Sequence, residues 1–190
     1  MLYNLAHKIQ EKLPWVWDMV EEANAAVFAL QKSRRLKALD ACCEPGVRVA
    51  TEADAAALAL FFARQPEDAF RWFRHHPFDE ASMRRLLRRR SYIIYVQEEN
   101  GQIAGYAFLR CFCNGKCFLG KMVDKDHQGK GICTKLCAVG MRMASALGIR
   151  MFESINKDNM GSMKASQKAC RVVVVEELEG GDVLIEDLPR

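Results

Sequence analysis

The chain has 190 residues, half of them hydrophobic and 27% charged, and a formal net charge of +4. This length suits one well-buried core rather than two domains of ordinary size. The small positive charge falls short of the basic excess that marks nucleic-acid-binding proteins. No segment approaches the roughly 20 apolar residues that cross a bilayer, and charged residues interrupt the N-terminal segment where a signal peptide would need an apolar core. We therefore expect a cytoplasmic protein with no membrane span and no nucleic-acid partner.

Eight cysteines in such a chain are expected to be free thiols. The segment CFCNGKC at 111–117 raises the question of a metal site. Its Asn114-Gly115 pair predicts a two-residue hairpin turn, which would set Cys111 and Cys113 on one face and Cys117 on the other. Three thiolates then cannot meet at one metal ion, so we expect buried free cysteines and no metal.

Residues 1–45 predict a helical extension. Leu2, Leu5 and Ile9 form one apolar stripe. A second stripe at helical spacing follows Pro14: Val16, Val20, Ala23, Val27 and Leu30. We expect a helical hairpin that packs on the main domain or on a second subunit. The alternative, a helix on a membrane surface, is disfavoured by its acidic polar face. The segment CCEPG at 42–46 then marks the domain boundary.

Residues 46–190 predict one α/β domain. The expected strands are 47–50, 91–97, 103–112, 116–123, 149–155, 171–177 and 182–188, and the expected helices are 51–62, 67–74, 80–90, 131–147 and 159–169. A capping box at Thr51 and Asp54 opens the first of these helices, and Asn100-Gly101 predicts a hairpin turn. The strand after helix 131–147 is expected to lie parallel to the strand before it. Together these elements predict a mixed, mainly antiparallel central sheet with flanking helices.

The segment DHQGKGICTKL at 126–136 lies between a strand and a helix. The unpaired N–H groups of the first helical turn and the positive end of the helix dipole make an anion site there. Gly129 and Gly131 would let a ligand approach the backbone, and Lys130 adds a charge. The segment matches neither the P-loop nor the dinucleotide fingerprint. Taken alone, it is equally compatible with a polar turn that opens a helix.

In its context, VDKDHQGKGICTKL resembles the acyl-CoA signature [Q/R]-x-x-G-x-[G/A] of the GCN5-related N-acetyltransferases (GNAT family). Gln128, Gly131 and Cys133 occupy its three defined positions. The resemblance runs from Val47 to the end of the chain and includes the strand order, the hairpin before the loop and the segment NKDNMGSMKAS at 156–166. It implies the GNAT-like acyl-CoA N-acyltransferase fold. It also implies an enzyme that moves an acetyl group from acetyl-CoA, its co-substrate, directly to the amine of a small acceptor such as an amino sugar.

The resemblance implies a role for each residue near the loop. The pyrophosphate would bind the backbone N–H groups of the following residues: Gln128, Gly129, Lys130, Gly131, Ile132, Cys133 and Thr134. The strand backbone at Met122 and Val123 would hold the pantetheine arm and polarise the thioester carbonyl, where a fixed N–H stabilises the developing oxyanion. Asn159 would bond the pantetheine side of the cofactor.

Two departures from the family pattern concern the chemistry. Cys133 stands where the signature has Gly or Ala, and Ser166 stands where many members have the tyrosine that protonates the departing thiolate. A thiolate leaves readily. We therefore keep Ser166, or a water molecule in its place, as the group that would assist the departing sulfur. An attacking amine must also lose a proton. We expect Glu153 to accept this proton; the alternative is that Glu153 only pairs with a nearby Lys or Arg.

On the acceptor side, the early helices of the family wall the pocket, and His76 and Asp79 in HHPFD are our candidates for acceptor contact. The arginines of segment 84–90 would suit an acidic acceptor or form a solvated helix face. A different kind of function also remains open, namely a catalytically silent acyl-CoA-binding module that docks a partner through its N-terminal helices. A homodimer through those helices or through the sheet edge is the expected form of any self-association.

Overall fold

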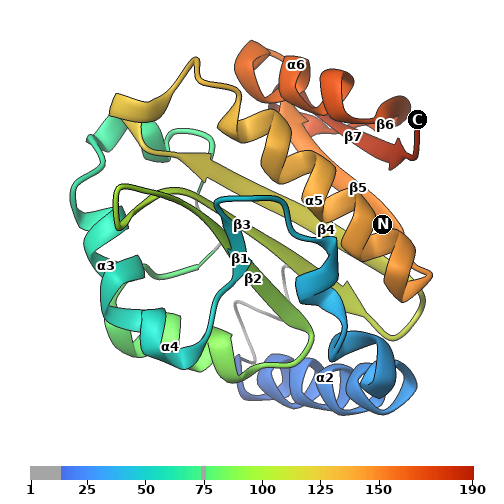
Figure 1. The fold of residues 1–190 in the computed structure, drawn as a ribbon. Helices are drawn as coiled ribbons and strands as arrows, with labels where there is room; N and C mark the ends of the chain where they lie inside the picture. The colour runs from blue at the N-terminus through green and yellow to red at the C-terminus, as the bar shows by residue number, and fades with distance from the viewer. Residues whose placement is uncertain (1–13, 74–75) are drawn as a thin grey trace.

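The computed structural model describes residues 14–73 and 76–190, and its centre is a seven-stranded sheet with helices on both faces (Figure 1). The strands follow the order β1-β2-β3-β4-β5-β7-β6 across the sheet. Their bounds are β1 Val47–Val49, β2 Tyr92–Glu99, β3 Gln102–Phe112, β4 Lys116–Val123, β5 Arg150–Asn156, β6 Arg171–Glu177 and β7 Asp182–Leu188. Among these described strands, only β4 and β5 pair in parallel, and all other neighbours are antiparallel. The predicted α/β class and the mixed, mainly antiparallel sheet are confirmed.

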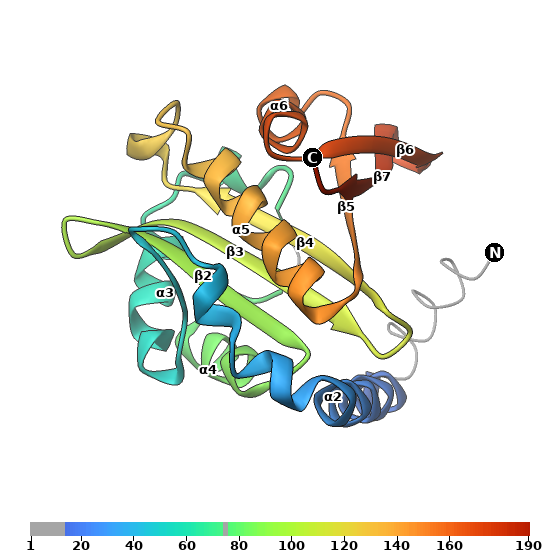
Figure 2. The ribbon, with the colours of Figure 1, turned by 45° about the vertical axis from the view of Figure 1, so that its right-hand side comes forward.

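Five α-helices are described: α2 Pro14–Leu36, α3 Ala55–Ala63, α4 Glu80–Arg88, α5 Ile132–Leu147 and α6 Met160–Ala169. Figure 2 shows α5 and α6 on one face of the sheet and α3 and α4 on the other. The helix predicted at 67–74 is wrong over residues 67–73, the part that the structure describes, because only a short 3-10 turn, Glu67–Phe70, forms there. Phe70 and Phe73 instead pack with Phe62 in an aromatic cluster, and this tertiary packing overrides the local helical pattern.

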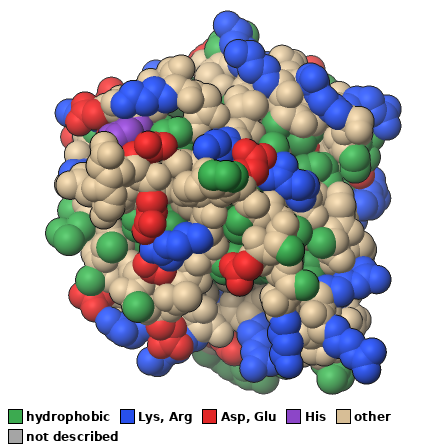
Figure 3. All heavy atoms as spheres, in the orientation of Figure 1, with side chains coloured by type: hydrophobic (Ala, Val, Ile, Leu, Met, Phe, Trp, Pro, Cys, Tyr) green, Lys and Arg blue, Asp and Glu red, His purple; other side chains and the backbone are tan. Residues whose placement is uncertain are grey.

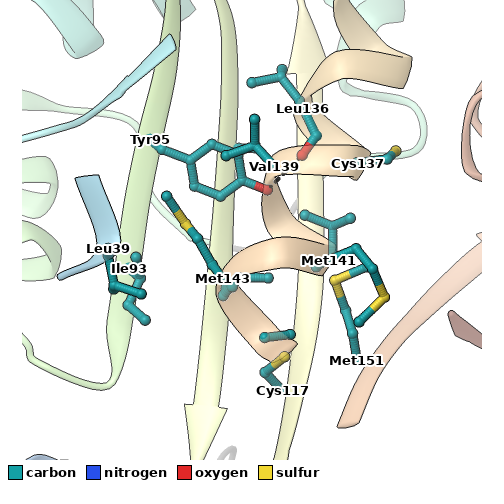
Figure 4. Packing of buried hydrophobic residues seen from close by; sticks show 14 of the residues in the cluster. Leu39, Ile93, Tyr95, Cys117, Leu136, Cys137, Val139, Met141, Met143 and Met151 are labelled. Atoms are coloured by element: carbon teal, nitrogen blue, oxygen red, sulfur yellow. Dashed lines mark hydrogen bonds between the residues drawn. The ribbon is translucent and has the colours of Figure 1, made fainter. Parts of the chain in front are cut away.

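Alternate residues of the central strands build two separate cores, as the period of a strand requires. Tyr95 and Leu109 face α5, whereas Ile94 and Tyr106 face α3 and α4. Figure 4 shows the first core, where the Tyr95 ring lies against α5. The buried Tyr95 hydroxyl donates to the Leu136 carbonyl over 3.0 Å, so its polar group is satisfied inside the core.

The predicted local signals are largely confirmed. Thr51 and Asp54 form a capping box before α3. Asn100 and Gly101 both have positive φ, 51° and 77°, as a two-residue hairpin turn requires. Gly148 ends α5 in the left-handed conformation, with φ 65°.

The hairpin between β3 and β4 differs from the prediction by one residue. Cys111 pairs with Cys117 and Phe112 with Lys116, so the loop has three residues and both cysteines share one buried face. Asn24 of α2 holds this loop, since its amide nitrogen donates to the Cys111 carbonyl over 2.9 Å and its oxygen accepts from the Cys113 N–H over 2.8 Å. Cys113 is exposed. Within the described residues no group of three metal-ligating side chains occurs.

The apolar stripe predicted for α2 is also wrong. Val20, Val27 and Leu30 are 55%, 43% and 81% exposed, while Phe28 on another face is fully buried. The buried face includes Glu21, whose carboxylate pairs with Arg110 and thereby tolerates burial. The stripe predicted at 2–9 lies outside the described residues. None of the described helices has the length and apolar character that a membrane crossing requires.

Candidate active site

The strands β4 and β5 separate soon after they meet. Their parallel pairing comprises only Lys116 with Arg150, Cys117 with Met151 and Phe118 with Phe152. From Leu119 to Val123, β4 keeps its partner β3 but has no strand partner on the β5 side among the described residues. Backbone groups on that edge of β4 are therefore available to a ligand.

The loop after β4 is anchored at its first residue. The Asp124 side chain is 6% exposed and accepts hydrogen bonds from Arg64 over 2.7 Å and Gln65 over 3.0 Å. A third bond comes from the Asp126 N–H over 3.0 Å. Burial opposes ionisation of Asp124, but the hydrogen bonds from Gln65, the Asp126 N–H and Arg64 outweigh it and lower the pKa to about 2. The loop therefore starts from a fixed, ionised point.

The two glycines of the loop face open space. Gly129 and Gly131 have φ of 76° and 81°, and a Cβ on either would meet nothing within 4 Å. Gly131 caps α5, and the first helical bond runs from the Lys135 N–H to its carbonyl over 3.0 Å. The N–H groups of residues 132–134, which precede Lys135 in the first turn, have no partner inside the helix. This open N-terminus fits a phosphate-sized anion, since the donors and the helix dipole both favour negative charge.

Three side chains meet where β4 and β5 part: Lys121 of β4, Glu153 of β5 and Ser166 of α6. The Lys121 ammonium pairs with the Glu153 carboxylate and donates to the Ser166 hydroxyl over 2.9 Å. The Ser166 hydroxyl donates to Glu153 over 2.8 Å. The structure thus brings the two predicted catalytic residues into direct contact, and it also places Glu153 in the lysine pair named as the alternative.

This cluster is almost completely buried. The Lys121 and Glu153 side chains are 3% exposed, and Ser166 is fully buried. Burial alone would lower the pKa of the Lys121 ammonium, but the negative charge of the paired Glu153 carboxylate outweighs it, so the pKa lies above its usual value. Lys121 as a whole residue is nevertheless only half-buried, so its exposed part is the backbone. The cluster therefore holds a buried ion pair beneath an accessible strand edge.

Asp187 of β7 extends the cluster. It is 1% exposed, and neither of its carboxyl oxygens has a hydrogen-bond partner in the described part of the chain. Burial and then the negative charge of Glu153 raise its pKa to about 8. Asp187 is therefore an uncharged carboxylic acid near neutral pH, beside the ion pair.

Sequence reasoning missed Lys121 and Asp187. A signal for Lys121 existed, because it alternates in β4 with Leu119 and Val123, which face the core under α5. A lysine on that face needs a buried partner. For Asp187 the signal was similar, since it alternates with the buried Val183 and Ile185.

The other predicted cofactor-binding residues lie on β4, α5 and α6. Met122 is buried against the α3–α4 side, and Val123 is half-buried. Asn159 caps α6, where its side-chain oxygen accepts from the Ser162 N–H over 3.2 Å. Cys133 lies in the first turn of α5; its pKa is lowered by a hydrogen bond with Cys137 and by the Lys121 charge, against the effect of burial.

His76 and Asp79 lie on the opposite face of the sheet from the Lys121 cluster. The His76 ring contacts Tyr92 and Phe108, and its Nε2 lies 3.0 Å from the Tyr106 hydroxyl. Its Nδ1 lies 2.9 Å from the Pro77 carbonyl, so Nδ1 donates and Nε2 accepts. Burial lowers the pKa of His76. Asp79 caps α4 by accepting from the Ser82 N–H over 2.9 Å.

Most arginines of the predicted cluster at 84–90 have carboxylate partners. Arg84 pairs with Glu80, Arg88 with Glu52, and Arg89 with Glu22. In the view of Figure 3, Lys and Arg side chains are interspersed with acidic ones and form no continuous basic surface on that face. The arginine helix is thus a paired surface face, which agrees with the solvated alternative.

A family model of the acetyltransferase (GNAT) domain matches residues 46–169. The chain belongs to the GNAT family. The match ends with the last residue of α6 and contains β4, the glycine loop, α5, β5 and α6, so it covers every element of the candidate site except β7, which carries Asp187. No curated protein matches the chain.

Solved structures share the GNAT fold with this chain. The GNAT domain of S. lividans PAT has 18% identity, 75% coverage of this chain, 89% coverage of that chain and a TM-score of 0.66. A Salmonella typhimurium protein, yncA, solved with acetyl-CoA, has 22% identity, coverages of 75% and 92% and a TM-score of 0.57. An aminoglycoside acetyltransferase solved with coenzyme A and kanamycin has 17% identity, coverages of 76% and 94% and a TM-score of 0.58.

Proposed function

We propose that this GNAT protein transfers an acetyl group from acetyl-CoA directly to the amine of a small acceptor. The observation that carries the proposal is the open N-terminus of α5, with Gly129 and Gly131 facing empty space, directly beside the unpaired edge of β4. An anion site joined by a short loop to a free strand edge suits a ligand with a pyrophosphate at one end and a thioester at the other. The acetyl-CoA and coenzyme A in solved relatives support the same ligand class.

The donor would lie along the loop and the strand edge. Residues 128–134 would bind the pyrophosphate through their N–H groups, helped by the charge of Lys130. The backbone of Met122 and Val123 would hold the pantetheine arm, and a β4 N–H would stabilise the oxyanion of the reacting carbonyl. The Asn159 amide nitrogen, which carries no hydrogen bond within the described residues, would donate to the arm.

The buried cluster would serve the proton transfers. The amine nitrogen bonds to the thioester carbon and loses a proton, while the carbon–sulfur bond breaks and the sulfur leaves as a thiolate. Glu153 would accept the amine proton directly or through water. Ser166 would donate to the sulfur, and the adjacent Lys121 ammonium would stabilise its negative charge. Lys121 thus supplies the electrostatic help that a tyrosine gives in many relatives.

The acceptor would enter from the face covered by α3 and α4. His76 is uncharged and held by Tyr106, so we propose that it shapes the pocket wall through its apolar surroundings. Asp79 would border the entrance as the exposed cap of α4. An amino sugar is our candidate acceptor, since one relative was solved with kanamycin.

A cytoplasmic location is proposed on two grounds. All eight cysteines are free thiols, which suits a reducing compartment, and acetyl-CoA is a cytoplasmic metabolite in the proposed reaction.

Calorimetric titration with acetyl-CoA, followed by thiol-release assays against a panel of amines, tests this function. We expect saturable binding and release of free thiol that depends on the amine. Absence of binding at millimolar acetyl-CoA would contradict the whole proposal. Binding without thiol release against any amine would contradict the enzyme and favour a silent acyl-CoA-binding module. Glu153→Gln should lower turnover more than it weakens binding, if the carboxylate handles a proton.

A further inference from the structure

Two cysteines lie one turn apart at the end of α5 that follows the glycine loop. Cys133 is in the first turn and is half-buried, whereas Cys137 is fully buried. Figure 4 shows Cys137 on the side of α5 away from Tyr95. Residues four apart share one face of a helix, and the Cys137 thiol donates a hydrogen bond to the Cys133 sulfur. The two thiols therefore form a pair that runs from the glycine loop into the core.

The inner thiol of this pair adjoins the cluster where β4 and β5 part. The Cys137 sulfur lies 3.8 Å from the Ser166 hydroxyl, which accepts from the Lys121 ammonium over 2.9 Å. Cys133 also lies at the positive end of the α5 dipole. A nearby cation and a helix N-terminus both favour a thiolate. The pKa of Cys133 accordingly lies below its ordinary value, first through the hydrogen bond from Cys137 and then through the Lys121 charge, against the effect of burial.

Two other accessible thiols provide a contrast. Cys43 is half-buried like Cys133, but burial and then the charge of Asp40 raise its pKa. Cys113 is exposed, but it lies in the hairpin loop between β3 and β4 rather than at a helix N-terminus. Accessibility alone would therefore make Cys113 the most reactive of the three, whereas thiolate character favours Cys133.

We propose that Cys133 is a modification site for the disulfide of coenzyme A, the thiol released in the proposed reaction. This inference rests on the proposed function. The open N-terminus of α5 would bind a pyrophosphate of the disulfide, because a Cβ on Gly129 or Gly131 would meet nothing within 4 Å. The pantetheine arm would follow β4, as proposed for acetyl-CoA, and would bring the sulfur toward Ser166. The thiol pair adjoins that point and presents Cys133 as its accessible member.

The step is a thiol–disulfide exchange. The Cys133 thiolate attacks one sulfur of the disulfide and forms a new sulfur–sulfur bond. The sulfur–sulfur bond of the reagent breaks, and the other coenzyme A leaves as a thiolate and takes a proton from water. Cys133 is thereby oxidised to a mixed disulfide, and the released coenzyme A is reduced. The attached coenzyme A would fill the donor site until a thiol reductant removes it, so oxidation of coenzyme A would switch off acetyl-CoA binding.

Mass spectrometry of the full chain after incubation with coenzyme A disulfide tests the proposal. We expect one coenzyme A attached at Cys133, and a loss of acetyl-CoA binding that dithiothreitol reverses. Modification of Cys113 before Cys133 would overturn the proposal.

A disulfide without phosphate tests the role of the anion site. Binding raises the effective concentration of a reagent at its target, so micromolar coenzyme A disulfide should modify Cys133 at least about tenfold faster than 2-hydroxyethyl disulfide does. Equal rates for the two reagents would show that the helix N-terminus does not direct the modification.

Substitutions identify the thiol and its partner. Cys133→Ser should abolish the adduct, whereas the matched controls Cys43→Ser and Cys113→Ser should form it at the native rate. Cys137→Ala should slow the reaction about threefold, because a smaller fraction of Cys133 is then thiolate although each thiolate is more nucleophilic. Cys137→Ser keeps a hydrogen-bond donor and should retain the native rate. A native rate in Cys137→Ala would contradict the thiol pair.

Calorimetric titration with acetyl-CoA distinguishes failure of this inference from failure of the proposed function. A protein that binds acetyl-CoA but forms no adduct at Cys133 would refute the modification alone. A protein that neither binds acetyl-CoA nor forms the adduct would refute the proposed function and the modification together.

Discussion

Variants of Gly131, compared with a variant of Gly101, distinguish the cost of backbone strain from the loss of ligand binding. The φ of 81° at Gly131 costs a residue with a Cβ about 1–2 kcal/mol, whatever the surrounding space. Gly101 has a φ of 77° and equally open surroundings, but it lies in the hairpin turn between β2 and β3. Gly131→Ala and Gly101→Ala should therefore lower the free energy of unfolding by similar amounts in urea denaturation.

Substitutions at Gly131 and at Gly101 should differ in their effect on acetyl-CoA binding. Gly131→Asp places a carboxylate at the proposed pyrophosphate site, where repulsion between two charges about 4 Å apart is about 1 kcal/mol even in water. Two phosphate charges give about 2 kcal/mol, or roughly 30-fold weaker binding. Calorimetric titration measures the loss, and Gly101→Ala should bind like the native protein. Native-like affinity of Gly131→Asp would show that the phosphates lie elsewhere.

Three further predictions concern stability in urea denaturation. Lys121→Met should cost about 3–5 kcal/mol by leaving Glu153 buried and unpaired, and Lys121→Met/Glu153→Leu should recover most of it; an equally unstable double variant would contradict this account. Because the folded pKa of Asp187, about 8, lies above its ordinary value of about 3.9, the folded protein retains a proton that the unfolded chain has lost. The native protein should therefore lose stability as pH rises from about 6.5 to 8, by up to about 1.4 kcal/mol per unit, and Asp187→Asn should not; parallel pH curves would refute the raised pKa. Asn24→Ala should cost about 1–3 kcal/mol through its two lost hydrogen bonds, whereas Gln31→Ala on the exposed side of α2 should cost little; equal effects would show that Asn24 does not hold the hairpin loop.

Most of the fold was predictable because its signals are local. The Asn100-Gly101 turn, the capping box before α3 and Gly148 after α5 each depend on a few neighbouring residues. The errors arose where contacts between residues far apart in sequence determine which side chains are buried. Hydrophobic periodicity placed the buried face of α2 among its valines, because it could not show that Arg110 stabilises a buried Glu21.

The candidate site likewise has one part that the sequence could predict and one part that it could not. The glycine loop could be found from sequence, since positive φ and an open helix N-terminus both select glycine. The cluster around Lys121 could not, because its members come from β4, β5, α6 and β7 and only the fold brings them together. Its roles in catalysis remain predictions, and the turnover of Glu153→Gln tests the role of Glu153.

The position of the anion site depends on how closely α5 approaches the sheet. A Cβ on Gly140 would lie 2.5 Å from the Tyr95 hydroxyl, and one on Gly105 would lie 2.7 Å from the Ile132 side chain. Two glycines far from each other in sequence thus set the height of the helix above the strands, and with it the distance between its N-terminus and the edge of β4. A larger residue at either position would tilt the helix and change the length of ligand that fits between phosphate and strand. We therefore expect substitutions at Gly105 or Gly140 to change the preference for the proposed acyl-CoA donor without altering any residue proposed to bind it.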